Sequence, residues 1–312
     1  MEMISHQVGI DVAKNELVTS IQAGKAFALP NTVEGCQELV GCLPEGSVVH
    51  LEASGGYERL VRRMLEASGF KVVLHNPLKP RRLAQAQGIR AKTDFVDARV
   101  LSQSGALLPE SPTKTLDRQA LADHSRAIDT LKETIADYKK RMKGPELDPV
   151  ARQIYAQSIS VIQKQLEIAE KAFAERIKAS GYALSFSWVC SVPALGPSTA
   201  RICICEFPED LMLRSTAQIA SYAGLAPIDN QSGNRIGRAH LGHGNNRLKR
   251  AFYMPAICAV RTQQWAKELY ARLRAKGRAH QSAIVAVMRR LLVRAVAVLK
   301  RGSPWQDEPI TT

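Results

Sequence analysis

The sequence predicts an α/β domain at the N-terminus, a long helical connector and a mostly helical C-terminal domain. Residues 1–112 contain five short apolar runs separated by turn residues and helical stretches. Residues 113–182 have the apolar periodicity of long helices, and residues 183–312 return to a globular, helical and basic pattern. With 312 residues, of which 45% are hydrophobic, the chain is large enough for these domains to have packed cores.

The N-terminal domain is expected to contain a mixed sheet. Its strands are expected at residues 7–11, 15–22, 25–29, 47–52 and 71–77. Its helices are expected at residues 31–43, 57–68 and 81–87, and from residue 94 onward. The first three strands form an antiparallel meander, and Thr93 or Asp94 caps the last helix. This order, β-β-β-α-β-α-β-α, is that of a ribonuclease H-like domain.

Acidic residues stand at unusual positions in this domain. Asp11 ends the first strand and Glu52 the fourth, while Asp94 and Asp97 project from one face of the last helix. A buried acid is costly unless it is paired, and four converging carboxylates would repel one another. Mg²⁺ removes that repulsion, leaves room for water and phosphate, and can be replaced by Mn²⁺. We therefore predict a divalent-metal site for phosphoryl transfer, with ordinary capping and loop acids as the alternative.

The connector is predicted to be coiled coil. Gly144, Pro145 and Pro149 interrupt two helical stretches, which form an antiparallel hairpin or pair with another subunit. The heptad positions of the first stretch hold Leu121, His124, Ile128, Leu131, Ile135, Tyr138 and Met142. Those of the second hold Tyr155, Ile159, Ile162, Leu166, Ala169 and Phe173.

Three features mark the C-terminal domain. Residues 191–200, SVPALGPSTA, are typical of a helix–hairpin–helix element, whose glycine turn approaches phosphate or simply joins two helices. Residues 229–250 are rich in glycine and arginine and are expected to form a loop. The last helix, within residues 282–300, has a long apolar face that should pack on the core.

The charge of the chain indicates a polyanionic partner. It has 43 Lys and Arg against 29 Asp and Glu, and residues 235–301 hold sixteen basic residues but only one acid, Glu268. Nucleic acid is favoured over an anionic membrane. No apolar run is long enough to span a membrane, and the N-terminus is neither a signal nor a transit peptide. Six cysteines without a paired CxxC motif indicate buried, reduced thiols and a cytoplasmic location.

Several segments occur in a characteristic order. They are GIDVAKNEL, LEASGGYERL, NPLKPRRLAQAQGIRAKTDFVDARVL, VPALGPSTA, GLAPIDNQSG and GNNRLKRAFYMPA. In this order they resemble the insertion-sequence 110/1111 family of transposases, which is related to the Piv DNA invertases. The resemblance implies a RuvC-like DEDD domain, a coiled-coil connector and a C-terminal transposase domain.

The resemblance also implies roles for individual residues. Asp11, Glu52, Asp94 and Asp97 would be the metal-binding carboxylates, and Ser232 the nucleophile that forms a covalent phosphoserine link. The implied partners are DNA at the element ends and target, a noncoding bridge RNA, and further copies of the chain in a dimer or tetramer. The implied location is the prokaryotic cytoplasm, at the nucleoid. The candidate nucleic-acid contacts are Lys92, Arg235, Arg238, Arg247, Lys249 and Arg250.

The chain departs from the family pattern near the serine. Family members often carry a second Ser or a basic residue where this chain has Asn230 and Gln231, and a Lys where it reads HLGHG. Either His240 or His243 takes over that role, or neither does.

Other functions are compatible with the same motifs. A Piv-type invertase shares all of them, and a metal-only RuvC-like nuclease or junction resolvase would use Ser232 merely to position phosphate. A non-catalytic nucleic-acid-binding protein is disfavoured because all four acids are present.

Overall fold

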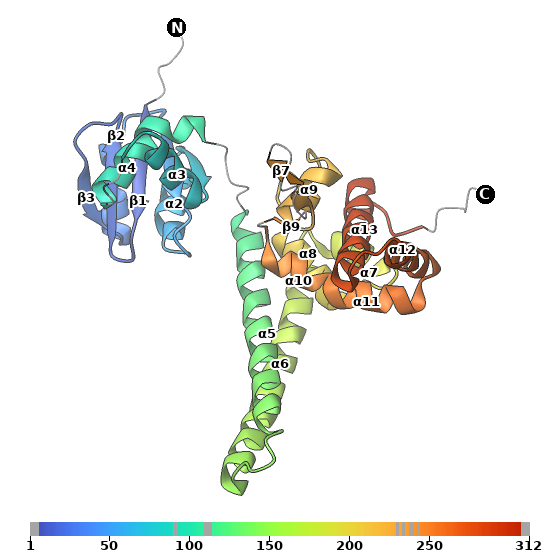
Figure 1. The fold of residues 1–312 in the computed structure, drawn as a ribbon. Helices are drawn as coiled ribbons and strands as arrows, with labels where there is room; N and C mark the ends of the chain where they lie inside the picture. The colour runs from blue at the N-terminus through green and yellow to red at the C-terminus, as the bar shows by residue number, and fades with distance from the viewer. Residues whose placement is uncertain are drawn as a thin grey trace. The chain divides into compact units, whose positions relative to one another are not determined.

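The computed structural model describes residues 6–89, 91, 93–108, 114–228, 231–232, 235–236, 240–242 and 244–306. Its contacts divide the chain into two compact units, residues 1–113 and 114–312, and each has its own hydrophobic core (Figure 1). The expected connector and the expected C-terminal domain lie together in the second unit. Among the described residues, no helix is both long and apolar enough to cross a bilayer.

The first unit contains a five-stranded mixed sheet in the order β3-β2-β1-β4-β5. The strands are β1 (Gln7–Val12), β2 (Glu16–Ile21), β3 (Phe27–Pro30), β4 (Val48–Glu52) and β5 (Lys71–His75). β1, β2 and β3 form the predicted antiparallel meander, and β4 and β5 extend the sheet in parallel with β1. All five predicted strands are therefore confirmed, with small differences at their ends.

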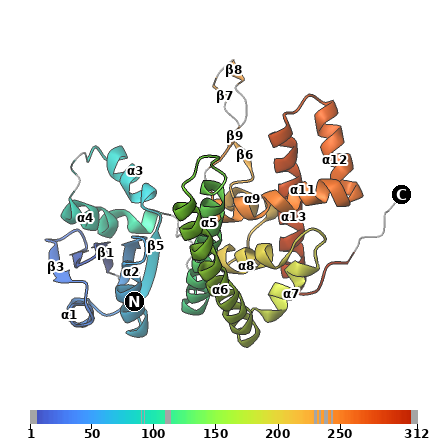
Figure 2. The same cartoon turned by 90° about the horizontal axis from the view of Figure 1, so that it is seen from below.

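Helices cover both faces of this sheet (Figure 2). They are α1 (Val33–Cys42), α2 (Glu58–Ala67), α3 (Leu78–Ala86), α4 (Asp94–Ser104) and the short 3₁₀ helix η1 (Gly105–Leu107). The predicted caps form, because Thr32 and Thr93 accept hydrogen bonds from the first turns of α1 and α4. Helix α3 begins three residues before the prediction, since the Asn76 side chain accepts a hydrogen bond from the Leu78 N–H at 3.0 Å.

Glycine at position 9 sets the distance between α4 and the sheet. A Cβ atom on Gly9 would lie 2.1 Å from the Ala98 carbonyl oxygen and 2.3 Å from the Ser102 nitrogen, both in the backbone of α4. Only a residue without a side chain permits so close an approach. The opposite face of β1 carries Val8 and Ile10, which are fully buried in the core that includes residues of α1 and α2.

Two buried histidines, His50 of β4 and His75 of β5, form a pair. The Nδ1 atom of His50 lies 2.9 Å from Nε2 of His75, and its Nε2 lies 2.7 Å from Oε1 of Gln7. His50 is only 2% exposed, and a Cβ on Gly105 would lie 2.4 Å from its ring. Burial, with the nearby charges of His75 and Lys71, lowers the pKa of His50 to about 4.

The second unit is almost entirely helical. Its helices are α5 (Leu116–Arg141), α6 (Pro149–Ala179), α7 (Ala183–Ser191), α8 (Pro197–Glu206), α9 (Thr216–Tyr222), α10 (Asn246–Ala251), α11 (Tyr253–Thr262), α12 (Gln264–Ala275) and α13 (His280–Arg301). α5 and α6 form a long hairpin that extends from the other helices of this unit (Figure 1). Ile128 and Phe173 are buried, and the His124 ring bonds to the Ala169 carbonyl at 2.9 Å, so the predicted heptad packing is confirmed.

The C-terminal helix closes the core of this unit. The apolar face of α13 is buried, as predicted from its sequence. The guanidinium of Arg294 packs on two indole rings, 4.0 Å from the centre of Trp265 and 4.7 Å from that of Trp305. The Trp305 N–H donates to the Ser191 Oγ at 2.7 Å, which ties the residues after α13 to the end of α7.

All six cysteines are free thiols, as predicted. Cys36, Cys203 and Cys205 are buried as expected, whereas Cys42 and Cys258 are exposed, so the prediction of buried thiols is wrong for these two. Burial raises the pKa of Cys203, so this thiol stays protonated and unreactive.

Gly9→Ala is expected to destabilise the first unit by about 3 kcal/mol, because the methyl group forces the backbones of β1 and α4 apart. Gly41→Ala is the matched control, since nothing lies within 4 Å of its added Cβ in helix α1. It should stabilise by about 0.5 kcal/mol through helix propensity. Urea denaturation measures both changes, and equal effects of the two substitutions would contradict the packing argument.

His50 should make the first unit acid-sensitive. Its pKa falls from 6.5 in the unfolded chain to about 4 in the folded one, so its stabilising effect is complete above pH 6.5. That effect, about 3 kcal/mol, is lost as the pH falls from 6.5 to 4, because the unfolded chain takes up the proton first. Urea denaturation of wild type and His50→Leu at pH 7 and pH 4 tests this. The expected pH dependence is smaller in the variant, and identical dependences would show the prediction to be wrong.

Candidate active site and nucleic-acid interface

Three of the four predicted carboxylates influence one another directly. Asp11 lies near the end of β1, and Asp94 and Asp97 lie in the first turn of α4. Burial, the charges of Asp94 and Asp97, and a hydrogen bond to Asp94 raise the pKa of Asp11 to about 6. The structure therefore brings Asp11 close to two acids that follow it by 83 and 86 residues in the sequence.

Glu52 completes the set at the end of the neighbouring strand. The parallel register pairs Ile10 with Leu51, so Asp11 and Glu52 follow at the same end of adjacent strands. Glu52 and Asp97 line one cavity of about 520 Å³. All four predicted carboxylates thus lie around one end of the sheet.

The donor set suits a hard divalent cation. Across the described ranges, no three His, Cys, Asp or Glu side chains stand close enough to hold a metal ion in their present positions. The acids are nevertheless crowded enough to perturb the pKa of Asp11, and a divalent cation would remove that repulsion. Because all four donors are carboxylates, Asp11, Glu52, Asp94 and Asp97 fit Mg²⁺ or Mn²⁺ better than a soft metal.

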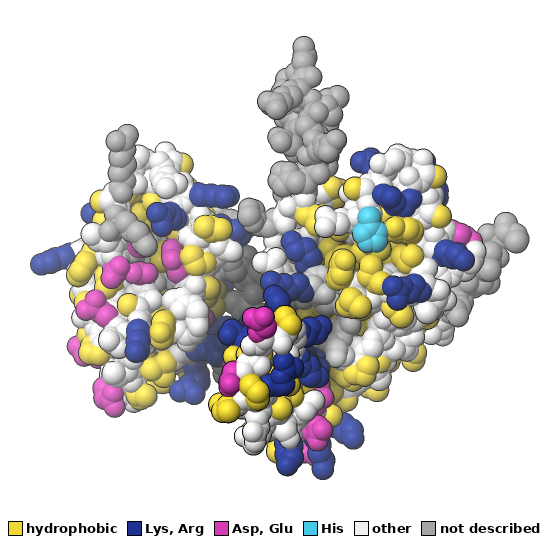
Figure 3. Space-filling view, turned by 60° about the horizontal axis from the view of Figure 1, so that its bottom comes forward, with side chains coloured by type: hydrophobic (Ala, Val, Ile, Leu, Met, Phe, Trp, Pro, Cys, Tyr) yellow, Lys and Arg dark blue, Asp and Glu magenta, His cyan; other side chains and the backbone are white. Residues whose placement is uncertain are grey.

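Basic side chains are widespread on the second unit. Figure 3 shows Lys and Arg over the visible face, with fewer Asp and Glu among them. Of the predicted nucleic-acid contacts, Arg247, Lys249 and Arg250 lie in α10, and the side chain of Arg250 is 81% exposed. Arg235 lies in strand β8 (Arg235–Ile236), whereas Lys92 and Arg238 fall outside the described residues.

The predicted nucleophile lies in a small β-ribbon and not in the expected loop. β6 (Pro227–Ile228) pairs with β9 (His240–Leu241), and β7 (Gln231–Ser232) pairs with β8. Two-residue strands rich in neighbouring glycines give no periodic pattern, which explains the wrong loop assignment. Register pairs Ser232 with Arg235, and Figure 2 shows β7 and β8 farther from the helices than β6 and β9.

Two histidines are candidates for a role beside Ser232. His240 lies in β9, where its backbone pairs with Ile228, and His243 falls outside the described residues.

At the base of the ribbon, the backbones of Gly224 and Gly244 are in close contact. A Cβ on Gly244 would lie 2.2 Å from the Gly224 nitrogen, and Gly224 itself has φ +67°. The Asn245 N–H donates to the Tyr222 carbonyl at 2.8 Å, directly beside this contact. The chain therefore enters and leaves the ribbon at a single fixed point.

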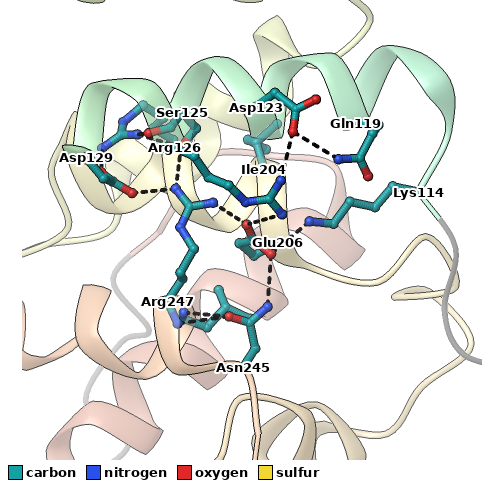
Figure 4. Close-up of polar contacts among 12 residues, drawn as sticks. Lys114, Gln119, Asp123, Ser125, Arg126, Asp129, Ile204, Glu206, Asn245 and Arg247 are labelled. Atoms are coloured by element: carbon teal, nitrogen blue, oxygen red, sulfur yellow. Dashed lines mark hydrogen bonds and ion pairs between the residues drawn. The ribbon is translucent and has the colours of Figure 1, made fainter. Parts of the chain in front are cut away.

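The buried carboxylate of Glu206 joins the base of the ribbon to the helical core (Figure 4). Glu206, at the end of α8, is 3% exposed and accepts hydrogen bonds from Lys114 at 2.8 Å, Asn245 at 3.0 Å and Arg247. Although burial disfavours the charged form, Lys114, Asn245 and Arg247 hold the pKa of Glu206 below its usual value. The carboxylate is therefore ionised, and both of its oxygens accept hydrogen bonds from these residues.

The same network extends to helix α5. Arg247 bonds to Asp129 at 2.5 Å and to the Ser125 hydroxyl at 2.9 Å, while Arg201 also pairs with Asp129. Asn245 caps α10, because its Oδ1 accepts hydrogen bonds from the N–H groups of Arg247 and Leu248. The guanidinium of Arg247 is thus engaged inside the protein, and its contact with nucleic acid stays a prediction.

Glu206 and Asn245 were not predicted from the sequence. A usable signal was present, because Glu206 directly follows the apolar run ICIC, as Asp11 and Glu52 stand in apolar strands. An acid in such a run indicates either a site or a buried ion pair.

Two family models match the chain over the regions just described. A DEDD model for IS110, described as a transposase, matches residues 8–145, and a model described as the Transposase IS116/IS110/IS902 family matches residues 187–271. Both matched regions of the chain are thus similar to transposases of the IS116/IS110/IS902 type. The resemblance found in the sequence motifs is thereby confirmed, and the two matches include all four carboxylates and Ser232.

Individual relatives span different lengths of the chain. The pilin gene-inverting protein of Moraxella bovis is 26% identical over 96% of this chain and 97% of its own length. That of Moraxella lacunata is 27% identical over the same shares. The insertion element IS110 uncharacterized 43.6 kDa protein of Streptomyces coelicolor is 31% identical over 38% of this chain and 29% of its own length.

Glu206→Ala is expected to destabilise the second unit by about 3 kcal/mol, because Lys114 loses its partner and Arg247 loses one of two carboxylates. Glu167→Ala removes an exposed glutamate of α6 and should change stability by less than about 0.5 kcal/mol. Thermal unfolding followed by circular dichroism compares them. Similar midpoints for the two variants would show that the Glu206 network does not stabilise the fold.

Proposed function

We propose that the protein cuts and rejoins DNA by phosphoryl transfer, with Ser232 as nucleophile and a divalent cation held by Asp11, Glu52, Asp94 and Asp97. The proposal depends chiefly on the convergence of Asp11, Asp94 and Asp97 in a unit that the DEDD transposase model matches. The strand order β3-β2-β1-β4-β5, antiparallel and then parallel, is also that of ribonuclease H-like nucleases. It supports a RuvC-like assignment for this unit.

In the proposed reaction, the Ser232 oxygen attacks a phosphodiester phosphorus. A serine–phosphate bond forms, one phosphorus–sugar oxygen bond breaks, the serine proton passes to a base, and the released sugar oxygen takes up a proton. The divalent cation would supply charge neutralisation at the phosphate. Arg235 and Arg238 follow the serine in sequence and are suited to stabilise negative charge on the phosphoryl oxygens.

This chemistry makes rejoining possible without an added energy source. One phosphate ester replaces another at each step, so a different sugar hydroxyl can attack the serine–phosphate and restore a DNA strand. A hydroxyl nucleophile is weak at neutral pH, so the reaction needs activation of Ser232 by neighbouring groups. A metal-only nuclease would instead use water and leave free ends.

The proposed partners are DNA and a bridge RNA encoded by the element. The excess of basic residues in 235–301 suits either polyanion, and guidance by RNA is carried over from the family resemblance. Both would contact the basic second unit.

Self-association is proposed through the outer face of α6. Val150, Ile154, Val161 and Ile168 are 64%, 57%, 61% and 61% exposed, and three of them recur every seven residues. This spacing is that of a coiled-coil seam, so a second copy of the chain is the expected occupant. A dimer or tetramer would follow.

DNA inversion is the second candidate function. It is favoured by the similarity to the Moraxella pilin gene-inverting proteins, which extends over nearly the whole chain. Inversion and transposition would share the same strand-exchange chemistry and differ in the arrangement of the DNA sites.

Ser232→Ala is expected to abolish a covalent protein–DNA adduct, and Asp11→Ala to reduce it by at least about 100-fold, since each removes a group that acts at the phosphate. The assay uses purified protein, Mg²⁺, element junction DNA and the flanking noncoding transcript, with products resolved before and after protease treatment. Ser221→Ala is the matched control, because Ser221 is an exposed serine of α9 near the ribbon.

The expected result is a protease-sensitive, RNA-dependent adduct in wild type and Ser221→Ala only. Free cleaved ends that persist in Ser232→Ala and disappear in Asp11→Ala would favour the metal-only nuclease. An adduct that forms equally well without the transcript would remove the RNA from the proposal.

A further inference from the structure

A cavity of about 520 Å³ lies beside the carboxylates of the first unit. Glu52 and Asp97 form its acidic side. Helix α3 and the residues that follow it form the remaining wall, which includes Leu78, Arg81 and Ile89. Sites that bind small organic groups have volumes of roughly 300–1,000 Å³, so this cavity can hold a unit the size of a nucleotide.

Helix α3 presents apolar, basic and amide side chains to the cavity. Leu78, Arg81 and Gln85 are spaced at i, i+3 and i+7, so they share one face of the helix. Leu78 is 58% exposed, although it is apolar, and Arg81 is also exposed. In the part of the chain that the structure describes, no hydrogen bond or ion pair to Arg81 occurs, so its guanidinium is available to an anion.

We infer that this cavity binds one nucleotide of the DNA strand, next to the phosphate that is cut. Arg81 pairs with the phosphate of that nucleotide, Leu78 and Ile89 contact its sugar and base, and Gln85 hydrogen-bonds to the base edge. This inference rests on the proposed function, because that function places a DNA phosphate at Glu52 and Asp97. It adds a binding site and four residues that make three kinds of contact with the nucleotide.

The combination of charges favours a nucleotide within a strand over other ligands. An acidic side would repel a free anion, whereas a phosphodiester held by the carboxylate-bound cation can present its neighbouring phosphate to the opposite wall. A guanidinium forms strong, charge-assisted hydrogen bonds with phosphate oxygens. An exposed leucine beside it is suited to the apolar face of a base or sugar, and an amide is suited to the polar edge of a base.

The test pairs Arg81→Ala with Arg82→Ala, since Arg82 is the next residue of α3, is exposed, and does not line the cavity. Adduct formation is measured on junction DNA in which one phosphate at a time, on either side of the cleavage site, is replaced by neutral methylphosphonate. In wild type and Arg82→Ala, one adjacent replacement should slow the reaction about tenfold. Arg81→Ala should be about tenfold slower on unmodified DNA and insensitive to that replacement.

DNA binding gives a second measurement. The slope of log affinity against log salt concentration should decrease by about 0.7–0.9 in Arg81→Ala and stay unchanged in Arg82→Ala. Thermal midpoints equal to that of wild type confirm that both variants fold.

Three results would overturn the inference. They are equal rates for the two variants, a methylphosphonate penalty that persists in Arg81→Ala, and a loss confined to binding of the noncoding transcript. Each can be recognised while wild type still forms the Ser232 adduct. Failure of the proposed function is distinct, because it removes the adduct from wild type itself or leaves it in Ser232→Ala.

Discussion

The contact between α4 and β1 at Gly9 is the constraint on which the first unit depends. A helix backbone this close to a strand fixes where the first turn of the helix ends up, and hence where Asp94 and Asp97 lie relative to Asp11. The position along the helix axis is fixed as well, because Ser102 accepts a hydrogen bond from the Ala23 N–H at 3.1 Å and donates one to Ser20. The crowding of acids is therefore imposed by the packing of the sheet, at a cost that a cation can offset.

The second unit also contains a buried acid, but this acid is neutralised in a different way. Here the buried acid, Glu206, pairs with two cations of the protein itself, Lys114 just before α5 and Arg247 in α10. Because Asp129 and Ser125 of α5 bind the same arginine, the helical hairpin and the base of the ribbon share one network. The hairpin is consequently part of the network that holds the base of the ribbon. A movement of α5 would therefore break contacts of Arg247.

Local patterns predicted most of this architecture. The apolar strand runs, the threonine caps and the heptads of α5 and α6 each depend on neighbours in sequence, so the sequence revealed them. Asp11 and Glu52 were predicted because they end apolar strands, and Asp94 and Asp97 because they share one face at the start of a helix. The ribbon, the Glu206 network and the early start of α3 were missed, since each depends on a pairing between distant residues or on one side-chain cap. Sequence periodicity carries no information about such pairings.

The indole rings around Arg294 have a spectroscopic consequence. The chain has three tryptophans, Trp188, Trp265 and Trp305, and all belong to the second unit. The first unit contains none, so tryptophan emission reports on residues 114–312 alone. Far-ultraviolet circular dichroism senses both units, so a transition that it detects without a change in tryptophan emission belongs to residues 1–113. The unfolding of the two units can therefore be followed separately in the native sequence.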